Sequence, residues 1–419
     1  MDDATIKAKL ATRDLSIDFV RVFSIILVVV LHTMMVGLSI DSSGKVTQIN
    51  PLEKLDWFPV ASWFGQIMPL FFVAGGFAAW VGWDSVKRKG GTWKEYLRSR
   101  AIRLLYPVAI FYGIWLIGIG LAVHVFNVDL SLMEMFLAGI GMPLWFVVAY
   151  ILCQIFTPII VIAHKSKPFL TLTVLLTGVV IVDLLCWLFN QPLIGLVNLL
   201  FVWLFATQLG FFLAQPVFAP SKLLLIVGVI AGFGLTAVVV ALNFYPADML
   251  ANLNPPKLPL VFIGVAWACL FTLLRPGIRQ LMTLKPVQAV VFVIGSRAMT
   301  VYLWHLPVVV ALSSLVLVAP NIIPSPGDEF FWLSRFLLLV PVFGIVLLIS
   351  LVLARFETGP KVGATPKPSA LLSGVIIGTV PSFVAMEISL SYSQIVWGFL
   401  FLWISIWLLI GKKSEKEKI

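Results

Sequence analysis

The sequence has few charged residues. They make up 11% of its 419 residues, whereas hydrophobic residues make up 60%. A soluble globular domain carries roughly a quarter charged residues and less than half apolar ones. A soluble fold of this length could not bury so much apolar surface, because it would still expose a large area to water. Soluble globular, disordered and coiled-coil proteins are therefore excluded, and a polytopic membrane protein is indicated.

Cysteine is also scarce. The three cysteines, Cys153, Cys186 and Cys269, lie far apart in sequence and inside apolar runs. A disulfide framework or a cysteine-based metal site needs clustered cysteines. We therefore expect all three to be packing residues, as buried free cysteines usually are, and we expect no metal cofactor.

Long apolar runs dominate the chain. A membrane-spanning helix needs about 20 mostly apolar residues, and twelve runs approach or exceed this length. They lie at 17–39, 58–83, 104–123, 142–163, 169–190, 193–214, 221–243, 258–274, 288–318, 330–353, 370–387 and 394–410. The run at 288–318 is long enough to tilt strongly or to contain a break. The predicted fold class is an all-α polytopic membrane protein with about twelve transmembrane helices.

A segment rich in proline and glycine interrupts the last third of the chain. It reads FETGPKVGATPKPSA and is typical of a linker. We predict a ten-helix membrane domain at 1–353, a cytoplasmic linker at 354–369, a C-terminal transmembrane helix pair at 370–411 and a basic tail at 412–419.

The net charge of +10 would favour a nucleic-acid partner in a soluble protein. In a membrane protein, the side on which the basic residues lie is more informative. With a cytoplasmic N-terminus, 23 of the 29 lysines and arginines lie in cytoplasmic segments, four lie outside, and Arg21 and Arg297 lie within helices. The positive-inside rule therefore predicts an inner-membrane protein with both termini in the cytoplasm. We expect the protein to contact the lipid bilayer and not to bind nucleic acid.

Ionisable residues inside the spans are the candidates for function, because burying them is costly unless they are paired or functional. Arg21 and His32 are eleven residues apart, which places them on nearly the same helix face with a rise of about 16 Å. An arginine near the inner surface suits a phosphate-bearing ligand, and a deeper neutral imidazole suits proton abstraction. Two alternatives stay open: Asp18 could neutralise Arg21, and His32 could be structural.

A second basic feature precedes the third span, in KRKGGTWKEYLRSRAIRLLYP. Arg100 and Arg103 are three residues apart, so a helix would place them on one face. Two guanidinium groups there could clamp a phosphate. The alternative is an ordinary orientation signal or an anchor for anionic lipid headgroups.

The ninth span, VVFVIGSRAMTVYLWHLPVVV, carries Arg297 about a third of the way in from the cytoplasm. His305 lies about 12 Å further out. Tyr302 and Trp304 are close to it, and Pro307 can kink the helix and open a cavity. The aromatic residues could form a sugar-binding wall, or they could be packing residues.

Five segments, in order, resemble those of the membrane-bound acyltransferase-3 family. The opening RDLSIDFVRVFSIILVVVLHT contains its Arg-x10-His motif as Arg21 and His32. The other segments are MPLFFVAGGF (68–77), RSRAIRLLYP with the motif Arg-x-x-Arg at Arg100 and Arg103, PLWFVVAY (143–150) and VYLWHLP (301–307). The resemblance covers about residues 13–353, so the C-terminal helix pair lies outside it.

The resemblance implies an integral-membrane O-acyltransferase. Such an enzyme takes an acyl group, usually acetyl, from cytoplasmic acetyl-CoA or another acyl-CoA. It transfers that group to a hydroxyl of an extracytoplasmic carbohydrate or glycolipid. By the resemblance, Arg21, Arg100 and Arg103 bind the phosphates of the coenzyme, and His32 is the catalytic histidine.

Our mechanistic hypothesis is a tunnel shared by donor and acceptor, in which His32 is the general base. Tyr302, Trp304 and Arg297 are predicted to bind the acceptor near His305, the second catalytic candidate. A covalent acyl-histidine on His32 or His305 is the rival mechanism.

Two other functions stay open. A proton-coupled secondary transporter would also have twelve spans, and Asp183, Arg297 and His305 could serve its coupling. Asp183 could instead be a partner for Arg297 or simply be protonated. A transporter usually shows an internal repeat and interrupted helix pairs, and we find no convincing repeat in the sequence. The third possibility is a non-catalytic lipid scaffold or flippase partner.

Overall fold

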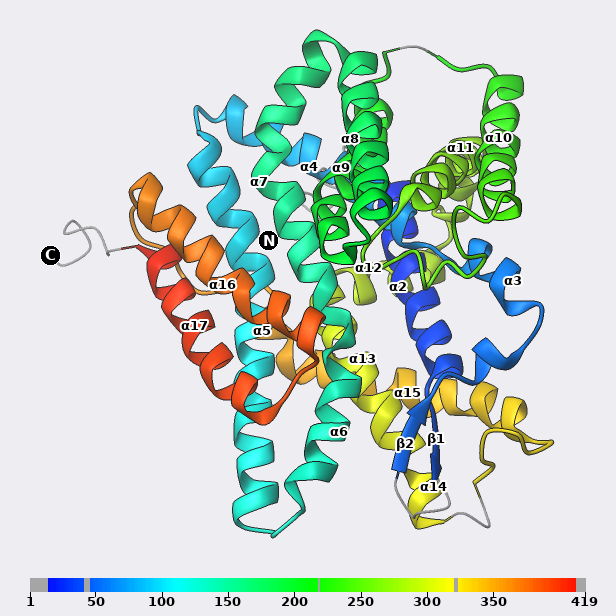
Figure 1. The fold of residues 1–419 in the computed structure, drawn as a ribbon. Coiled ribbons are helices and arrows are strands. Elements are labelled where there is room, and N and C mark those ends of the chain that lie inside the picture. Colours follow the sequence, from blue (N-terminus) through cyan, green and yellow to red (C-terminus); the bar gives the residue numbers. More distant parts are fainter. Residues whose placement is uncertain (1–13, 41–45, 218, 320–322, 412–419) are drawn as a thin grey trace, which may run out of the picture. The chain divides into compact units, whose positions relative to one another are not determined.

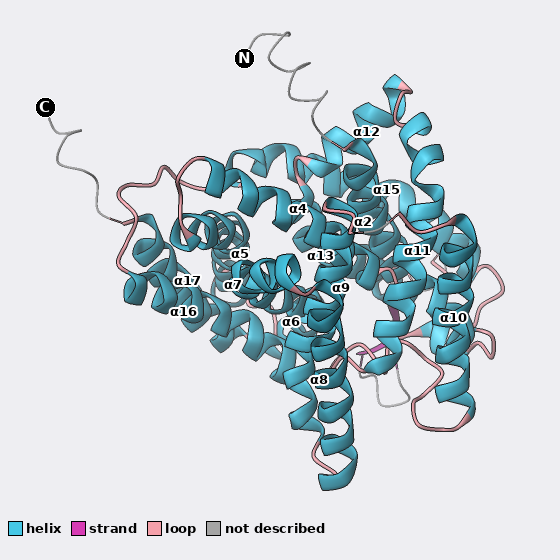
Figure 2. Ribbon diagram, turned by 90° about the horizontal axis from the view of Figure 1, so that it is seen from above, coloured by secondary structure: helices cyan, strands magenta, loops and turns pink. Residues whose placement is uncertain are grey.

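The computed structural model describes residues 14–40, 46–217, 219–319 and 323–411. Among these residues, the only paired strands are β1 (Gly37–Ile40) and β2 (Val46–Ile49), which form an antiparallel hairpin (Figure 2). Twelve helical segments of the described chain are long and apolar enough to cross a membrane. The predicted all-α polytopic fold with about twelve transmembrane helices is therefore confirmed.

The helices carry the labels of Figure 1. In chain order they are α2 (Leu15–Met35), α3 (Phe58–Gly65), α4 (Met68–Arg88), α5 (Trp93–His124), α6 (Leu130–Gly141), α7 (Trp145–Ser166), α8 (Pro168–Phe189), α9 (Asn198–Ala214), α10 (Lys222–Ala241), α11 (Leu258–Leu281), α12 (Lys285–Gly295), α13 (Ala298–Ser313), α14 (Leu315–Val318), α15 (Phe331–Leu353), α16 (Pro368–Ile388) and α17 (Tyr392–Ile410). Short 3₁₀ turns lie at Pro51–Lys54, Met142–Leu144, Pro192–Val197 and Ala354–Phe356.

Helix breaks interrupt or border three of the predicted spans. The long run at 288–318 is broken between Gly295 and Ala298, where Arg297 leaves the helical conformation (φ −124°, ψ 24°). The second span is broken before Pro69, and the fourth is preceded by α6 and begins with a 3₁₀ turn that contains Pro143. Proline is tolerated in the first turn of a helix, where its missing N–H would have no intrahelical acceptor. These two prolines therefore mark where α4 and the turn before α7 begin.

The basic segment between the second and third spans is mostly helical, because α4 runs to Arg88 and α5 begins at Trp93. Thr92 starts α5 with a capping box: its hydroxyl accepts from the N–H of Lys94, and the Glu95 carboxylate accepts from the N–H of Thr92 at 2.8 Å. Reciprocal capping satisfies N–H groups that a helix start leaves unpaired. Arg100 and Arg103 therefore lie on a helix, as the predicted clamp requires.

The described chain divides into two compact units, of which the first contains residues up to 27, 57–82 and 156–296. Within it, α4 and α9 approach until their backbones touch. A Cβ atom on Gly76 would lie 1.9 Å from the carbonyl oxygen of Thr207, and one on Gly210 would lie 2.0 Å from that of Val73. Glycine at both positions permits this contact, as small residues do at membrane helix interfaces.

The second unit contains residues 28–56, 83–155 and 297–419. Its C-terminal helices α16 and α17 pack on each other, and α17 packs along α5 (Figure 1). The hydroxyl of Tyr112 donates to the carbonyl of Pro381 at 3.3 Å. The buried Arg98 donates to the carbonyls of Leu409 at 2.7 Å and of Gly363 at 3.1 Å, and also to that of Ile410. The C-terminal pair is thus bound to the helix that carries Arg100 and Arg103.

Candidate active site

The second unit brings His32 of α2 and His305 of α13 into direct contact. The distance from His32 Nδ1 to His305 Nε2 is 2.7 Å, and the two ring planes are only 7° apart. His305 is fully buried, whereas His32 is half-buried. The accessible edge of the pair is therefore on His32.

The hydrogen bonds of His305 determine which nitrogen carries the proton in a neutral pair. His305 Nδ1 lies 2.6 Å from the carbonyl oxygen of Tyr302. A carbonyl only accepts, so Nδ1 is the protonated nitrogen and Nε2 carries the lone pair. His32 Nδ1 must then donate to His305 Nε2. The lone pair of His32 is consequently on Nε2, which is the basic atom of the pair.

This order of protons suits a general base. His32 Nε2 can accept a proton while Nδ1–H keeps its bond to His305. The resulting positive charge is shared through that bond, and it is stabilised by the carbonyl dipole of Tyr302 beyond it. A base that is oriented by a second group, which is itself held by a third, is a recurring catalytic arrangement.

The other predicted residues of α13 lie in well-packed surroundings. The Tyr302 hydroxyl donates to the carbonyl of Pro143 at 2.8 Å. The Trp304 ring stacks on Trp115 at 5.9 Å and meets the edge of Phe111 at 5.4 Å between centroids. Both side chains are buried. Tyr302 and Trp304 therefore each have packing partners within the protein. An acceptor-binding role for either residue stays a prediction.

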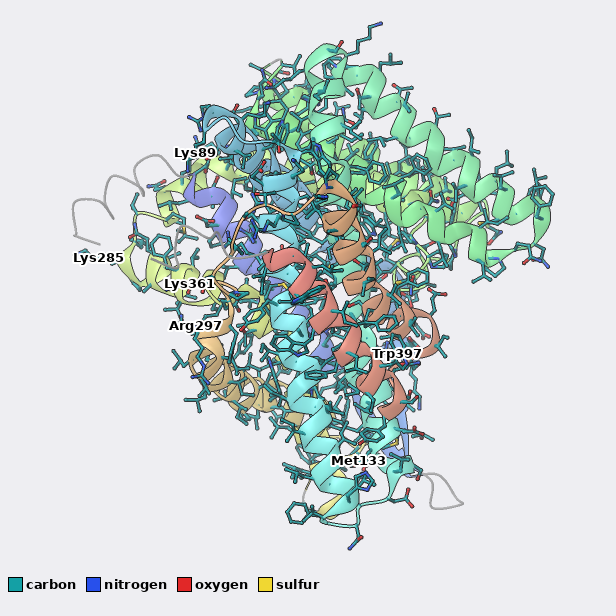
Figure 3. All side chains as sticks on the ribbon, turned by 90° about the vertical axis from the view of Figure 1, so that its left-hand side faces the viewer. Lys89, Met133, Lys285, Arg297, Lys361 and Trp397 are labelled. Atoms are coloured by element: carbon teal, nitrogen blue, oxygen red, sulfur yellow. The ribbon has the colours of Figure 1, made fainter. Side chains whose placement is uncertain are left out.

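Arg297 lies at the start of α13, where it is half-buried (Figure 3). It is eight residues before His305, a rise of about 12 Å. Close by, the Glu357 carboxylate accepts from the N–H of Thr300 at 2.7 Å. A carboxylate is favourable at a helix N-terminus, because the helix dipole is positive there. No pattern in the sequence predicts this contact, because Glu357 lies in the predicted linker.

The two arginines of α5 have different surroundings. Arg100 is half-buried, and its guanidinium lies 5.5 Å from the ring centroid of Tyr96. The Tyr96 hydroxyl in turn donates to Gln154 at 2.6 Å. Arg103 is exposed. The cation–π contact with Tyr96 holds Arg100 in place. The three-residue spacing keeps the guanidinium groups of Arg100 and Arg103 on one side of the helix.

Helix α5 connects these arginines to the surroundings of the histidine pair. Phe111 and Trp115, which touch Trp304, are eight and twelve residues beyond Arg103, so the rise along α5 is about 12–18 Å. On α2, the rise from Arg21 to His32 is about 16 Å.

Arg21 is half-buried, and its Nε atom is buried without a hydrogen-bond partner in the described part of the chain. A buried donor usually has a hydrogen-bond partner, and a bound phosphate would supply one. The observation agrees with the predicted phosphate-binding role of Arg21, which stays a prediction.

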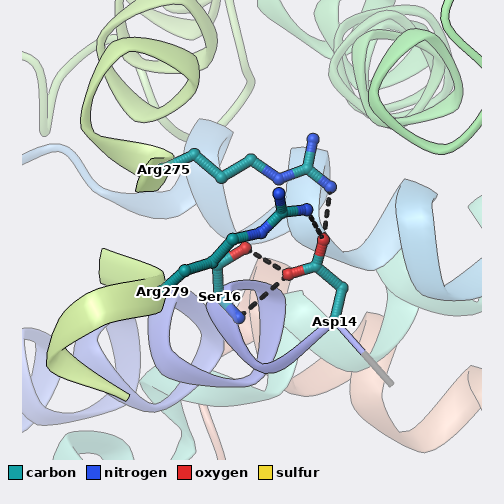
Figure 4. A network of polar contacts seen from close by, with 4 residues as sticks. All are labelled: Asp14, Ser16, Arg275 and Arg279. Carbon is teal, nitrogen blue, oxygen red and sulfur yellow. Dashed lines mark hydrogen bonds and ion pairs between the residues drawn. The ribbon is translucent and has the colours of Figure 1, made fainter. Parts of the chain in front are cut away.

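The start of α2 is held by an ion-pair network in the first unit (Figure 4). One carboxylate oxygen of Asp14 accepts from Arg275 and from Arg279, each at 2.6 Å. The other accepts from the N–H of Ser16 at 3.1 Å and from its hydroxyl. Burial alone would raise the pKa of Asp14, but hydrogen bonds from Arg279, Ser16 and Arg275 outweigh it and hold that pKa well below its usual range.

Asp183 has three donors in the first unit. Its carboxylate accepts from the Asn198 amide at 2.8 Å, the Tyr245 hydroxyl at 2.7 Å and the N–H of Leu258 at 3.0 Å. Burial and the charge of Asp183 together raise the pKa of Tyr245, so this hydroxyl stays a donor. These three hydrogen bonds tie α8 to α9 and to the start of α11. The structure therefore gives Asp183 a structural role without invoking proton coupling.

No group of three or more histidine, cysteine, aspartate or glutamate side chains that could hold a metal ion occurs among the described residues. Cys153, Cys186 and Cys269 are free thiols.

The fold is that of a polytopic membrane protein with an intramembrane pair of histidines. A family model described as an acyltransferase domain matches residues 14–355. The chain therefore belongs to the membrane acyltransferase-3 family and is a membrane acyltransferase. Helices α16 and α17 lie beyond the matched residues. Among curated proteins and among solved structures, no significant match to the chain is found.

Proposed function

We propose that the protein transfers an acyl group, with acetyl the expected one, from acyl-CoA to a hydroxyl of a carbohydrate or glycolipid. The donor binds from the cytoplasm and the acceptor is extracytoplasmic, in an inner-membrane enzyme with both termini inside. The observation that carries the proposal is the His32–His305 pair, in which a buried histidine orients a more accessible one. Family membership supports acyl transfer as the reaction, and the positive-inside distribution supports the orientation.

In the proposed reaction, His32 Nε2 takes the proton of the acceptor hydroxyl. The hydroxyl oxygen attacks the thioester carbonyl carbon, and the carbon–sulfur bond breaks as the new ester forms. The coenzyme leaves as a thiolate and takes the proton from the His32 imidazolium, which restores the neutral pair. General-base catalysis of this kind contributes a factor of about 10²–10⁴ in rate.

The donor phosphates are proposed to bind Arg100 and Arg103. Guanidinium groups form bidentate, charge-assisted bonds with phosphate, and the rise of about 12–18 Å along α5 requires a donor whose reactive end extends well beyond its phosphates. Acyl-CoA has that form, because a long flexible arm separates its thioester from its phosphates. Arg21, on the same helix as His32, is proposed as a further phosphate ligand.

A covalent mechanism is the second candidate, because His32 Nε2 could attack the thioester itself. Acid quenching followed by mass spectrometry of the intact chain distinguishes the two. Direct transfer leaves the mass unchanged, whereas the covalent route adds an acyl mass that disappears in His32→Gln.

The function is tested with the purified chain in lipid vesicles, given labelled acetyl-CoA and an extract of envelope glycans and glycolipids. We expect a labelled product with the wild type and none with His32→Ala, while coenzyme binding by calorimetry is retained in both. His124→Gln is the matched control, because His124 is exposed at the end of α5. Full activity of His32→Ala would exclude His32 as the base, and failure of the wild type to bind acyl-CoA would refute the proposed donor.

A further inference from the structure

The second unit contains a cavity of about 500 Å³ beside the first turns of α15. Its size is within the range of small-molecule sites, about 300–1,000 Å³. Most of the described residues that line it are apolar, and they include Leu312, Leu315, Leu337 and Leu338. Arg335 is the only charged residue among the described ones. Neither histidine of the candidate active site is among its lining residues.

Arg335 is buried, and its partners among the described residues are neutral. It is 2% exposed. Its Nη1 atom donates to the carbonyl of Val36 at 3.2 Å and to the hydroxyl of Ser313 at 2.7 Å, and its guanidinium lies 4.6 Å from the ring centroid of Phe331. The Nε atom is buried and has no hydrogen-bond partner within the described residues. Among the described residues, none of these contacts of Arg335 is with a negatively charged group.

A buried cation without a counter-charge is costly in a membrane protein, and the cost is offset when an anion binds beside it. Arginine is well suited to a phosphate, since its planar fork donates two parallel hydrogen bonds. Nη1 is occupied by protein groups, but Nε is not. The cavity is therefore lined by a buried cation whose Nε has no protein partner among the described residues.

The place of Arg335 along α15 suits a lipid headgroup. It is four residues beyond the first residue of the helix, a rise of about 6 Å, so it lies near one end of the span rather than at its centre. Around it, Leu333 and Leu337 line the cavity and are 55% and 64% exposed. In a bilayer such exposed apolar residues face lipid, which lets a hydrocarbon chain enter from the side.

We propose that this cavity binds an anionic phospholipid of the surrounding bilayer. Its phosphate accepts from Arg335, and one hydrocarbon chain lies against Leu312, Leu315 and Leu338. A neutral lipid would leave the charge of Arg335 unmatched, and a free phosphate would leave the apolar walls unfilled. The inference does not rest on acyl transfer.

The test is native mass spectrometry of the full chain in detergent, titrated with phosphatidylglycerol and with phosphatidylcholine of identical chains. We expect phosphatidylglycerol to bind at least tenfold more tightly, and to lose that preference in Arg335→Gln. Because Arg335 also bonds Val36 and Ser313, a second variant leaves those bonds intact. Leu338→Trp fills the cavity and should weaken binding to a similar extent, whereas Val340→Trp, at a position on α15 that is 75% exposed and does not line the cavity, should not.

Equal binding of the two lipids by the wild type would overturn the proposal, as would undiminished phosphatidylglycerol binding in Leu338→Trp. Displacement of the lipid by inorganic phosphate would identify a free-anion site instead and would also overturn it. Acyl transfer is not the readout, so these results are independent of the proposed enzyme function.

Discussion

Replacing His305 tests whether the buried histidine orients the base. In His305→Ala, His32 Nδ1–H loses its acceptor, and the tautomer with the lone pair on Nε2 is no longer favoured. In His305→Gln, a side-chain oxygen can accept from His32, and the amide nitrogen can donate to the carbonyl of Tyr302. The two variants therefore differ in whether the order of protons in the pair can be maintained.

The expected magnitude follows from the lost hydrogen bond. His32 is positively charged during transfer, and a hydrogen bond involving a charged group contributes about 1.5–3 kcal/mol. Each 1.36 kcal/mol is a factor of about ten in rate, so His305→Ala should lower kcat by about 10–150-fold. Loss of the base itself in His32→Ala should cost about 10²–10⁴-fold. His305→Gln should lie between His305→Ala and the wild type.

The assay is steady-state transfer from labelled acetyl-CoA in lipid vesicles, with kcat and KM determined separately. A positioning residue lowers kcat and leaves the KM for the coenzyme nearly unchanged. His124→Gln serves as the control for a histidine outside the pair. Wild-type kcat in His305→Ala would refute the orienting role, and a loss as complete as in His32→Ala with no rescue by glutamine would show that His305 itself moves the proton.

Three further predictions concern charged residues of the described chain. Arg100→Ala should raise the dissociation constant of acetyl-CoA by about 10–150-fold, since a charged hydrogen bond is worth about 1.5–3 kcal/mol; calorimetry measures it, and exposed Lys89→Ala should leave it unchanged. Arg98→Ala should destabilise the fold by about 1.5–3 kcal/mol, because three carbonyls near the end of α17 lose their donor; an unchanged unfolding temperature would contradict this. Asp14→Asn should lower the unfolding temperature at pH 7. The folded pKa of Asp14 is below its ordinary value of 3.8, so its contribution is present above about pH 4 and is lost as the pH falls through the folded pKa. The difference between wild type and variant should therefore shrink in acid, and a difference that grows there would refute the assigned sign.

Much of the fold could be predicted from the sequence. Hydropathy along the chain located the twelve spans, because every lipid-spanning helix must be apolar over its own length. The break in the ninth span was one of two outcomes that its length allowed. The same local information identified Arg21, His32, Arg100 and His305 as candidates, since ionisable residues are rare inside apolar runs.

The contacts between these candidates were decided by the tertiary structure. His32 and His305 are 273 residues apart, and no periodicity links positions on different helices. The direction of their shared hydrogen bond depends on one backbone carbonyl that the sequence does not distinguish from any other. The neutral surroundings of Arg335 and the three donors of Asp183 likewise arise from helices packed side by side. Hydropathy and spacing act along one helix, whereas the chemistry of this protein depends on which side chains several helices bring within hydrogen-bonding distance.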